Sequence, residues 1–221
     1  MSLLLNEIEV RILGSLIEKE ISTPDYYPMT LNALTNACNQ KNNRDPIVEF
    51  EDTTVVRGLD SLRDKSLATM VTGAGMRVPK YRQKITEVLA LTEQQTAALC
   101  ILMLRGPQTV GEIRNRGAML FEFQNLEETE LVLQSLIERT PDTLVAHLPR
   151  LAGQKEIRFA HLLCGEPHVV HSSVSLPPEA ARVQVLSENE RITKLEVTVQ
   201  SLKEEQEKLI QQFAEFKKQF E

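Results

Sequence analysis

An uninterrupted run of long polar side chains precedes a predicted helix in the first third of the chain. The run is Asn39-Gln40-Lys41-Asn42-Asn43-Arg44, and the helix begins near residue 51. Asn, Gln and Arg side chains match the hydrogen-bonding edges of bases, and groups near a helix N-terminus can hold phosphates. Asn side chains also satisfy backbone groups inside loops. The run therefore fits either a nucleic-acid contact or an internal role in an elaborate loop.

Further cations follow the run on the predicted third helix and hairpin. Arg57 should face away from the core of that helix, and Arg77, Lys80, Arg82 and Lys84 form a basic strand suited to phosphates. Exposed lysines on a strand also protect a sheet edge against pairing. The predicted nucleic-acid contacts are Asn39, Gln40, Lys41, Asn43, Arg44, Arg57, Lys80 and Arg82.

The sequence gives little support for a metal site or a catalytic site. His161, Cys164, His168 and His171 lie within a short stretch and have side chains that bind zinc. Their spacing matches no recurrent zinc motif, so we predict no metal site. Residues 73–75 lack the continuation of a phosphate-binding glycine loop and are expected to form a turn. No catalytic set stands out, so we expect no cofactor and no enzyme.

The elements that must position these residues follow from hydrophobic spacing. A single apolar stripe predicts a first helix that ends near Glu20, and Thr30 should cap a second. A third helix begins near Glu51 or Asp52, and segments 67–72 and 76–82 predict a hairpin around the glycine turn. Three helices and a hairpin make a winged helix. The buried positions are Leu5, Ile8, Ile12, Leu13, Leu16, Leu31, Leu34, Ala37, Val55, Leu59 and Leu62.

The pattern recurs about 86 residues later, where residues 91–93 repeat residues 5–7. Thr92 and Gln95 have the spacing of a capping box. The sequence therefore predicts two tandem winged-helix domains, 1–86 and 87–166. Gly58 lies inside the predicted third helix, where glycine costs about 1 kcal/mol relative to alanine. Something must approach its backbone closely, and a neighbouring helix is favoured over a DNA backbone.

The C-terminal segment has a different pattern. Residues 167–185 are rich in proline and serine and predict a linker, and residues 186–221 show a heptad repeat that predicts a coiled-coil helix. An apolar stripe on an isolated helix needs a partner, so we expect a homodimer through this helix, with folding back onto the domains as the alternative. The seam consists of Ile192, Leu195, Val199, Leu202, Gln206, Leu209, Phe213, Phe216 and Phe220.

Charge limits where nucleic acid could bind. The chain has a net charge of −6, which opposes DNA binding because affinity for DNA comes from neutralised phosphates. Residues 1–86 contain as many basic as acidic residues, so we seek the DNA-facing surface there. Acids at 127, 128 and 130 open the third helix of the second domain, which we expect to contact protein. The sequence shows neither a membrane-spanning stretch nor a signal peptide, which favours the cytoplasm.

Several motifs together resemble a known family. These are Glu18-Lys19, Thr23-Pro24, Tyr27-Pro28, Asn32, the run from Ala37 to Lys41, Asn43-Arg44, Pro46, Leu104-Arg105-Gly106, Gln108-Thr109, Gly111-Glu112 and Arg114. They resemble the YceH-like proteins, a group of bacterial tandem winged-helix proteins, over roughly residues 3 to 166. The resemblance implies a mainly α fold with small β-hairpins. It implies no activity and does not extend to the helix from about residue 186.

Two functions from different classes follow. The first is a DNA-binding, transcription-regulator-like dimer in which the first domain contacts double-stranded DNA through residues 39–44, Arg57 and the hairpin. The second is a protein-interaction scaffold that uses tandem winged helices without DNA, which the acidic pI of about 5.4 favours. A continuous positive strip joining the third helix and the hairpin would favour the first function.

Overall fold

The structure is a computed structural model that describes residues 4–73, 77–150, 156–166 and 199. Within those residues it contains seven α-helices and two small antiparallel sheets. This mixture of helices and short strands agrees with the predicted class, mainly α with small β-hairpins. The chain divides into two units, Met1–Val169 and Val170–Glu221, and all the helices and strands given below belong to the first.

The N-terminal half of the first unit runs from α1 to β3. Its elements are α1 (Glu7–Ser22), a 3-10 turn (Pro24–Tyr26), β1 (Met29–Thr30), α2 (Leu31–Cys38), α3 (Asp52–Asp64), β2 (Ala68–Val71) and β3 (Lys80–Gln83), and the short helix α4 (Ile85–Val88) follows. The strands form an antiparallel sheet in the order β1-β3-β2. Tyr81 lies opposite Met29 on one side and Met70 on the other. The third strand of this sheet, β1, was not predicted.

Side-chain caps explain where the helices of this half begin. The Asn6 side chain accepts a hydrogen bond from the Glu9 backbone while the Glu9 carboxylate accepts one from the Asn6 backbone, which is a capping box at the start of α1. The Thr30 hydroxyl accepts from the Ala33 backbone and caps α2, as predicted. The predicted start of α3 near Asp52 is also confirmed.

The C-terminal half repeats this order of elements. It contains α5 (Glu93–Arg105), α6 (Val110–Gly117), α7 (Leu126–Ile137), β4 (Val145–Leu148) and β5 (Arg158–His161). A single β-bridge between Gln108 and Phe159 stands where the first half has β1. The predicted capping box of Thr92 and Gln95 is present at the start of α5. The repeat seen in the sequence is therefore a repeat of elements.

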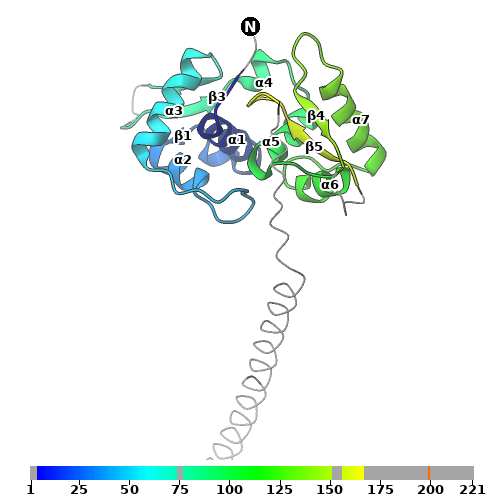
Figure 1. Cartoon of the computed structure of the whole chain (residues 1–221). Coiled ribbons are helices and arrows are strands. Elements are labelled where there is room, and N and C mark those ends of the chain that lie inside the picture. Colours follow the sequence, from blue (N-terminus) through cyan, green and yellow to red (C-terminus); the bar gives the residue numbers. More distant parts are fainter. Residues whose placement is uncertain (1–3, 74–76, 151–155, 167–198, 200–221) are drawn as a thin grey trace, which may run out of the picture. The chain divides into compact units, whose positions relative to one another are not determined.

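The two halves meet through α1 and α5, which lie side by side between them (Figure 1). Residues 9–17 of α1 and 96–104 of α5 are buried without interruption. A helix that is buried all round must pack against neighbours on every side, and here each helix contacts its own half and the other half. The Cys100 thiol lies 3.4 Å from the Gly14 carbonyl oxygen, so the helix backbones approach closely.

Gly58 on α3 makes a second close approach. A Cβ atom at this position would lie 2.4 Å from Cδ1 of Ile12 and 3.1 Å from Cγ2 of Ile8. Both atoms belong to α1. The neighbour that requires this glycine is therefore a helix and not a DNA backbone, as the sequence favoured.

The three cysteines are free thiols in different surroundings. Cys38 and Cys100 are buried, and Cys164 is exposed. Burial raises the pKa of Cys38 to about 11 and also raises the pKa of Cys100. These two thiols are therefore protonated and shielded at neutral pH.

The predicted linker (167–185) and coiled-coil helix (186–221) lie outside the described residues except for Val199. The homodimer seam of Ile192, Leu195, Leu202, Gln206, Leu209, Phe213 and Phe216 thus remains a prediction, as does the domain boundary at residue 86. Among the described helices, none combines the length and the apolar composition that a membrane crossing needs.

Replacing Gly14 with alanine should destabilise the joined halves. The new Cβ atom would lie 2.9 Å from Cδ2 of Leu104 and 3.3 Å from Cβ of Met103, and the latter atom is fixed to the α5 backbone. We expect a loss of about 1–3 kcal/mol in the free energy of unfolding, measured by urea denaturation. Gly111→Ala is the control, because its nearest neighbour is 4.0 Å away. Equal stability of Gly14→Ala and wild type would contradict the close packing of α1 and α5.

Candidate functional site

The loop from residue 39 to residue 51 joins α2 to α3 and contains the predicted polar run. The Asn39 amide donates to the Phe50 carbonyl oxygen at 2.8 Å and accepts from the Phe50 backbone at 2.7 Å. These two bonds hold the ends of the loop together. For Asn39 the structure therefore shows the internal role, and the expectation of a base contact is corrected.

Arg44 lies at the centre of the loop, and none of its side chain is exposed. Its guanidinium donates to both carboxylate oxygens of Glu18, at 3.0 and 2.6 Å, and to the Ala37 carbonyl oxygen at 3.2 and 3.0 Å. It also donates to Oε1 of Gln40. The expectation that Arg44 contacts nucleic acid is corrected, because internal acceptors occupy its donors.

A second arginine, Arg11 on α1, was not singled out from the sequence. It is buried and donates to the backbone carbonyls of Cys38 and Pro46, on either side of Arg44. Burial lowers the pKa of Arg11, and the charge of Arg44 lowers it further. Two cations, Arg11 and Arg44, thus anchor the loop to α1. Within the described residues, Glu18 is the only carboxylate that forms an ion pair with either of them.

The Glu18 carboxylate is ionised in this setting. Burial alone would raise its pKa, but hydrogen bonds and charge from Arg44, with a smaller contribution from Lys19, hold the pKa below its usual value. Stabilisation by the Arg44–Glu18 pair is therefore present at neutral pH. It is lost as the pH falls through the lowered pKa of Glu18.

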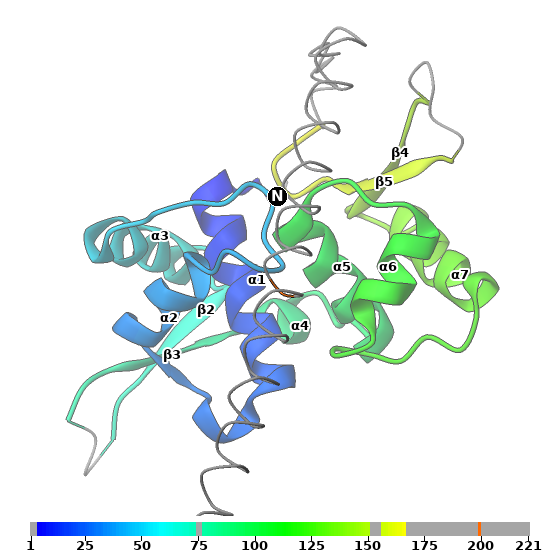
Figure 2. The same cartoon turned by 90° about the horizontal axis from the view of Figure 1, so that it is seen from below.

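A cavity of about 370 Å³ opens beside this pair. The loop approaches α5 here, where the Asp45 backbone donates to the Leu104 carbonyl oxygen at 2.9 Å (Figure 2). The walls come from α1, the loop, the end of α5, and α6 with the segment after it. The lining residues are Glu18, Lys19, Ser22, Gln40, Lys41, Asn42, Asn43, Ile101, Leu104, Arg105, Arg116, Met119 and Leu120.

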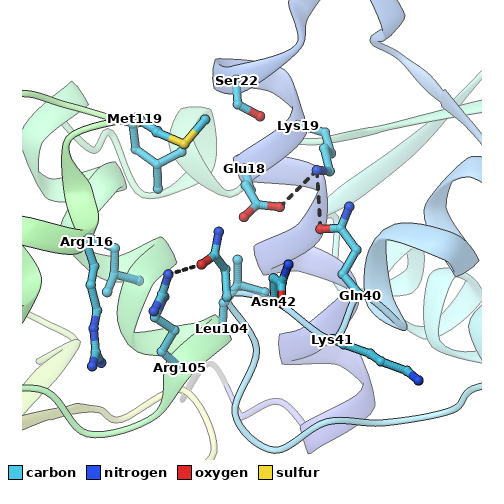
Figure 3. A pocket seen from close by; sticks show the side chains of 13 residues that line it. Glu18, Lys19, Ser22, Gln40, Lys41, Asn42, Leu104, Arg105, Arg116 and Met119 are labelled. Carbon is cyan, nitrogen blue, oxygen red and sulfur yellow. Dashed lines mark hydrogen bonds and ion pairs between the residues drawn. The ribbon is translucent and has the colours of Figure 1, made fainter. Parts of the chain in front are cut away.

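The lining is strongly cationic. Arg105 and Arg116 lie on one side and Lys19 with Gln40 on the other, while Lys41 lies at the edge with its side chain extending outward (Figure 3). Glu18 is the single acidic residue among the lining residues, and it pairs with Arg44 at 2.6 Å and with Lys19 at 3.4 Å, while Arg116 lies 3.4 Å from Glu112. Burial lowers the pKa of Arg105, and the charge of Arg116 lowers it further.

The structure therefore separates the predicted contacts into two groups. Gln40, Lys41 and Asn43 lie at the cavity, where Arg105 donates to the Asn43 side chain. Lys80 and Arg82 lie on the β2–β3 hairpin, which projects away from α5 (Figure 2).

The surface of α3 has a mixed charge. Arg57 is exposed, as predicted, and forms no ion pair within the described residues. Other cations of the helix are paired: Arg63 with Asp60 at 3.0 Å and Lys65 with Glu9 at 2.7 Å. The helix also begins with acids at positions 51 and 52. The same repulsion of phosphate that we expect at α7 therefore acts at the start of α3.

The hairpin cations are partly neutralised. Arg82 pairs with Glu87, and Lys84 lies 3.9 Å from the same carboxylate. Lys80 and the exposed Arg77 form no ion pair within the described residues. The continuous positive strip that would favour DNA is thus interrupted on α3 and is strongest on the hairpin.

The second half presents an acidic and apolar helix. Leu126 and Leu131 on α7 are 52% and 67% exposed. Glu127 and Glu130 are exposed beside them. This surface opposes phosphate and suits an apolar partner with basic residues.

The histidine cluster is only partly described. His161 lies on β5, where burial lowers its pKa to about 4, and Cys164 is exposed nearby. His168 and His171 lie outside the described residues. Within the described ranges no three His, Cys, Asp or Glu side chains come together as metal ligands would.

Sequence reasoning missed the cavity itself. Arg105 and Arg116 come from the second half of the unit, and Lys19 comes from α1. Lys19 and Arg105 belong to the motifs that resemble the YceH-like family, but the spacing of motifs along a chain does not show that they meet. In the sequence, the cavity is therefore indicated only by separate polar residues near the ends of predicted helices.

Replacing Arg44 with methionine should destabilise the protein strongly. The change removes the bidentate partner of the largely buried Glu18 carboxylate and leaves only Lys19, 3.4 Å away; losing the main partner of a buried charge costs about 3–5 kcal/mol. Urea denaturation at pH 7 measures the change in unfolding free energy. The double variant Glu18→Gln with Arg44→Met should recover part of the loss, because no uncompensated charge remains. A single variant as stable as wild type would show that the pair is not structural.

Comparison with known proteins supports a single family over the whole chain. The family described as "Protein of unknown function, DUF480" matches residues 5–154. A UPF0502 protein of Geotalea uraniireducens is 53% identical over 221 residues, covering all of both chains. A UPF0502 protein of Opitutus terrae is 50% identical over 175 residues, covering 79% of this chain and 75% of its own.

The full-length similarity extends beyond the region of the predicted resemblance. The alignment with the Geotalea protein includes the C-terminal segment after residue 186, which the motifs did not reach. These matches are consistent with the YceH-like resemblance. The chain belongs to the DUF480 family of UPF0502 proteins.

Proposed function

We propose that the two halves are winged-helix modules and that the chain is a DNA-binding, transcription-regulator-like protein. The repeated order of elements supports the first part, since three helices followed by a hairpin occur twice. Dimerisation through the predicted heptad seam belongs to the same proposal. In a winged helix the third helix enters the major groove and the hairpin contacts the backbone.

One observation favours DNA contact by the N-terminal half. Arg57 on α3, and Arg77 and Lys80 on the hairpin, form no ion pair within the described residues. Such cations can neutralise phosphates and release counterions without first breaking an internal pair. Arg82 and Lys84 would add to the hairpin contact at the expense of their bonds to Glu87.

The acids of α3 define what kind of binding to expect. Glu51 and Asp52 at its start, and Asp60 and Asp64 further along, repel phosphates that approach the helix. Contact should therefore depend mainly on the hairpin and Arg57. Such binding is dominated by phosphates, so it should be sensitive to salt.

The double variant Arg57→Ala with Lys80→Ala should weaken DNA binding. We expect the slope of log affinity against log salt to fall by about 2, because two phosphate contacts are removed. This slope is measured by fluorescence anisotropy of a labelled duplex at salt concentrations from about 50 to about 200 mM, a range over which phosphate contacts change the affinity strongly. Arg114→Ala with Arg150→Ala, two positions in the second half of the unit, is the control with the same change in charge. Absence of duplex binding by wild type at the lower salt would contradict DNA binding.

A second function is favoured by α7. Its exposed Leu126 and Leu131 lie among acids, so the helix suits a protein partner with an apolar and basic surface. The chain would then act as a scaffold, without DNA binding. The two functions use different helices and can be separated by substitution.

Substitution of Leu126 and Leu131 by serine should abolish binding of such a partner. Both side chains are exposed, so the fold should be unaffected. Affinity purification with wild type should recover one stoichiometric protein that the double serine variant loses and the Arg57, Lys80 variant retains. If wild type and the double serine variant recover the same proteins, a docking role for α7 is contradicted.

A further inference from the structure

We propose that the cavity between α1, the 39–51 loop, α5 and α6 binds a small organic anion that has phosphate or carboxylate groups and an apolar part. This inference does not depend on DNA binding. It assigns Gln40, Asn43 and their neighbours to a small molecule, whereas the sequence placed them at nucleic acid.

The charge of the lining is the first argument. Lys19, Arg105 and Arg116 come from three separate helices and meet around one space. Carboxylates balance these cations only in part: Glu18 is shared between Lys19 at 3.4 Å and the buried Arg44 at 2.6 Å, and Arg116 lies 3.4 Å from Glu112, while Arg105 forms no ion pair within the described residues. Cations that lie together in a partly enclosed space repel one another, and a bound anion would remove that repulsion.

The charges of neighbouring arginines act on Arg105, and its pKa reflects them. Burial is the largest cause of its lowered pKa, and the charges of Arg116 and Arg44 lower the pKa further, against the opposite effect of Glu18. A bound phosphate or carboxylate would stabilise the charged guanidinium, because such a group can accept two parallel hydrogen bonds from it. Arg105 is therefore the residue most suited to hold the anionic group.

Amide and apolar side chains suggest the rest of the ligand. Gln40, Asn42 and Asn43 offer donors and acceptors along the loop side of the cavity. Leu104 lines the α5 side, and Met119, which is 76% exposed, borders the same space. A volume of about 370 Å³ lies within the range of small-molecule sites. A phosphorylated or carboxylated organic molecule fits this lining better than a simple inorganic ion.

The walls are already held in place. The Asp45 backbone is bonded to the end of α5, Arg105 donates to the Asn43 side chain, and Arg44 binds the loop to α1. Asn43 has a φ of 63°, a left-handed conformation that asparagine tolerates better than most residues. A ligand would therefore find a formed site and would not have to order the loop.

Calorimetric titration of the full chain at low salt tests the proposal. The probes are AMP, citrate and pyrophosphate, with adenosine as the uncharged control for AMP. We expect AMP or citrate to bind at one site per chain, and adenosine to show no binding. Lys19→Gln and Arg105→Gln, singly and together, should weaken binding by about tenfold or more for each lost charge-assisted bond. Arg57→Gln with Lys80→Gln is the control and should bind like wild type.

The variants also separate this site from the DNA surface. Lys19→Gln keeps the loop bonds of Arg44 and Arg105, so a loss of ligand binding by this variant with an unchanged melting temperature reports on the cavity. Failure of AMP, citrate and pyrophosphate to bind wild type would overturn the proposal, as would equal binding by the cavity variants. A duplex whose affinity falls in the cavity variants and not in the Arg57, Lys80 variant would assign these cations to DNA instead.

Discussion

The ion pair between Arg44 and Glu18 fixes the position of the loop that forms one wall of the cationic cavity. Arg44 is buried, so its charge needs a partner, and Glu18 on α1 supplies one with two parallel hydrogen bonds. The pair holds the middle of the loop while Asn39 closes its ends. Within the run, Gln40 then accepts a hydrogen bond from Lys19 of α1, and Asn43 accepts one from Arg105 at the end of α5.

The contact between α1 and α5 places the end of α5 against the loop. Gly14 allows the two helices to approach closely, and the end of α5 brings Arg105 beside Asn43. A Cβ atom at Gly14 would press on Leu104 and Met103 of α5, so glycine allows this close approach. The cationic cavity is therefore a product of how the halves pack, and neither half contains it alone.

The sequence predicted the elements well because their signals are local. Thr30 and the Thr92–Gln95 box lie next to the helices that they cap, and the glycine at 58 indicated a neighbouring helix correctly. The roles of the polar run were not predictable in the same way. Arg44 is 26 residues from Glu18, and a buried ion pair and an exposed phosphate contact use the same residue type. The cavity needs residues from α1, α5 and α6, and no periodic pattern encodes that meeting.

The burial of two of the three cysteines has a practical consequence for studying this protein. Cys38 and Cys100 are enclosed in the core, while Cys164 lies exposed after β5, close to where the second unit begins. A maleimide reagent should therefore modify Cys164 in the native protein without any engineered change. A fluorophore or spin label attached there would report on the surroundings of the residues that follow β5.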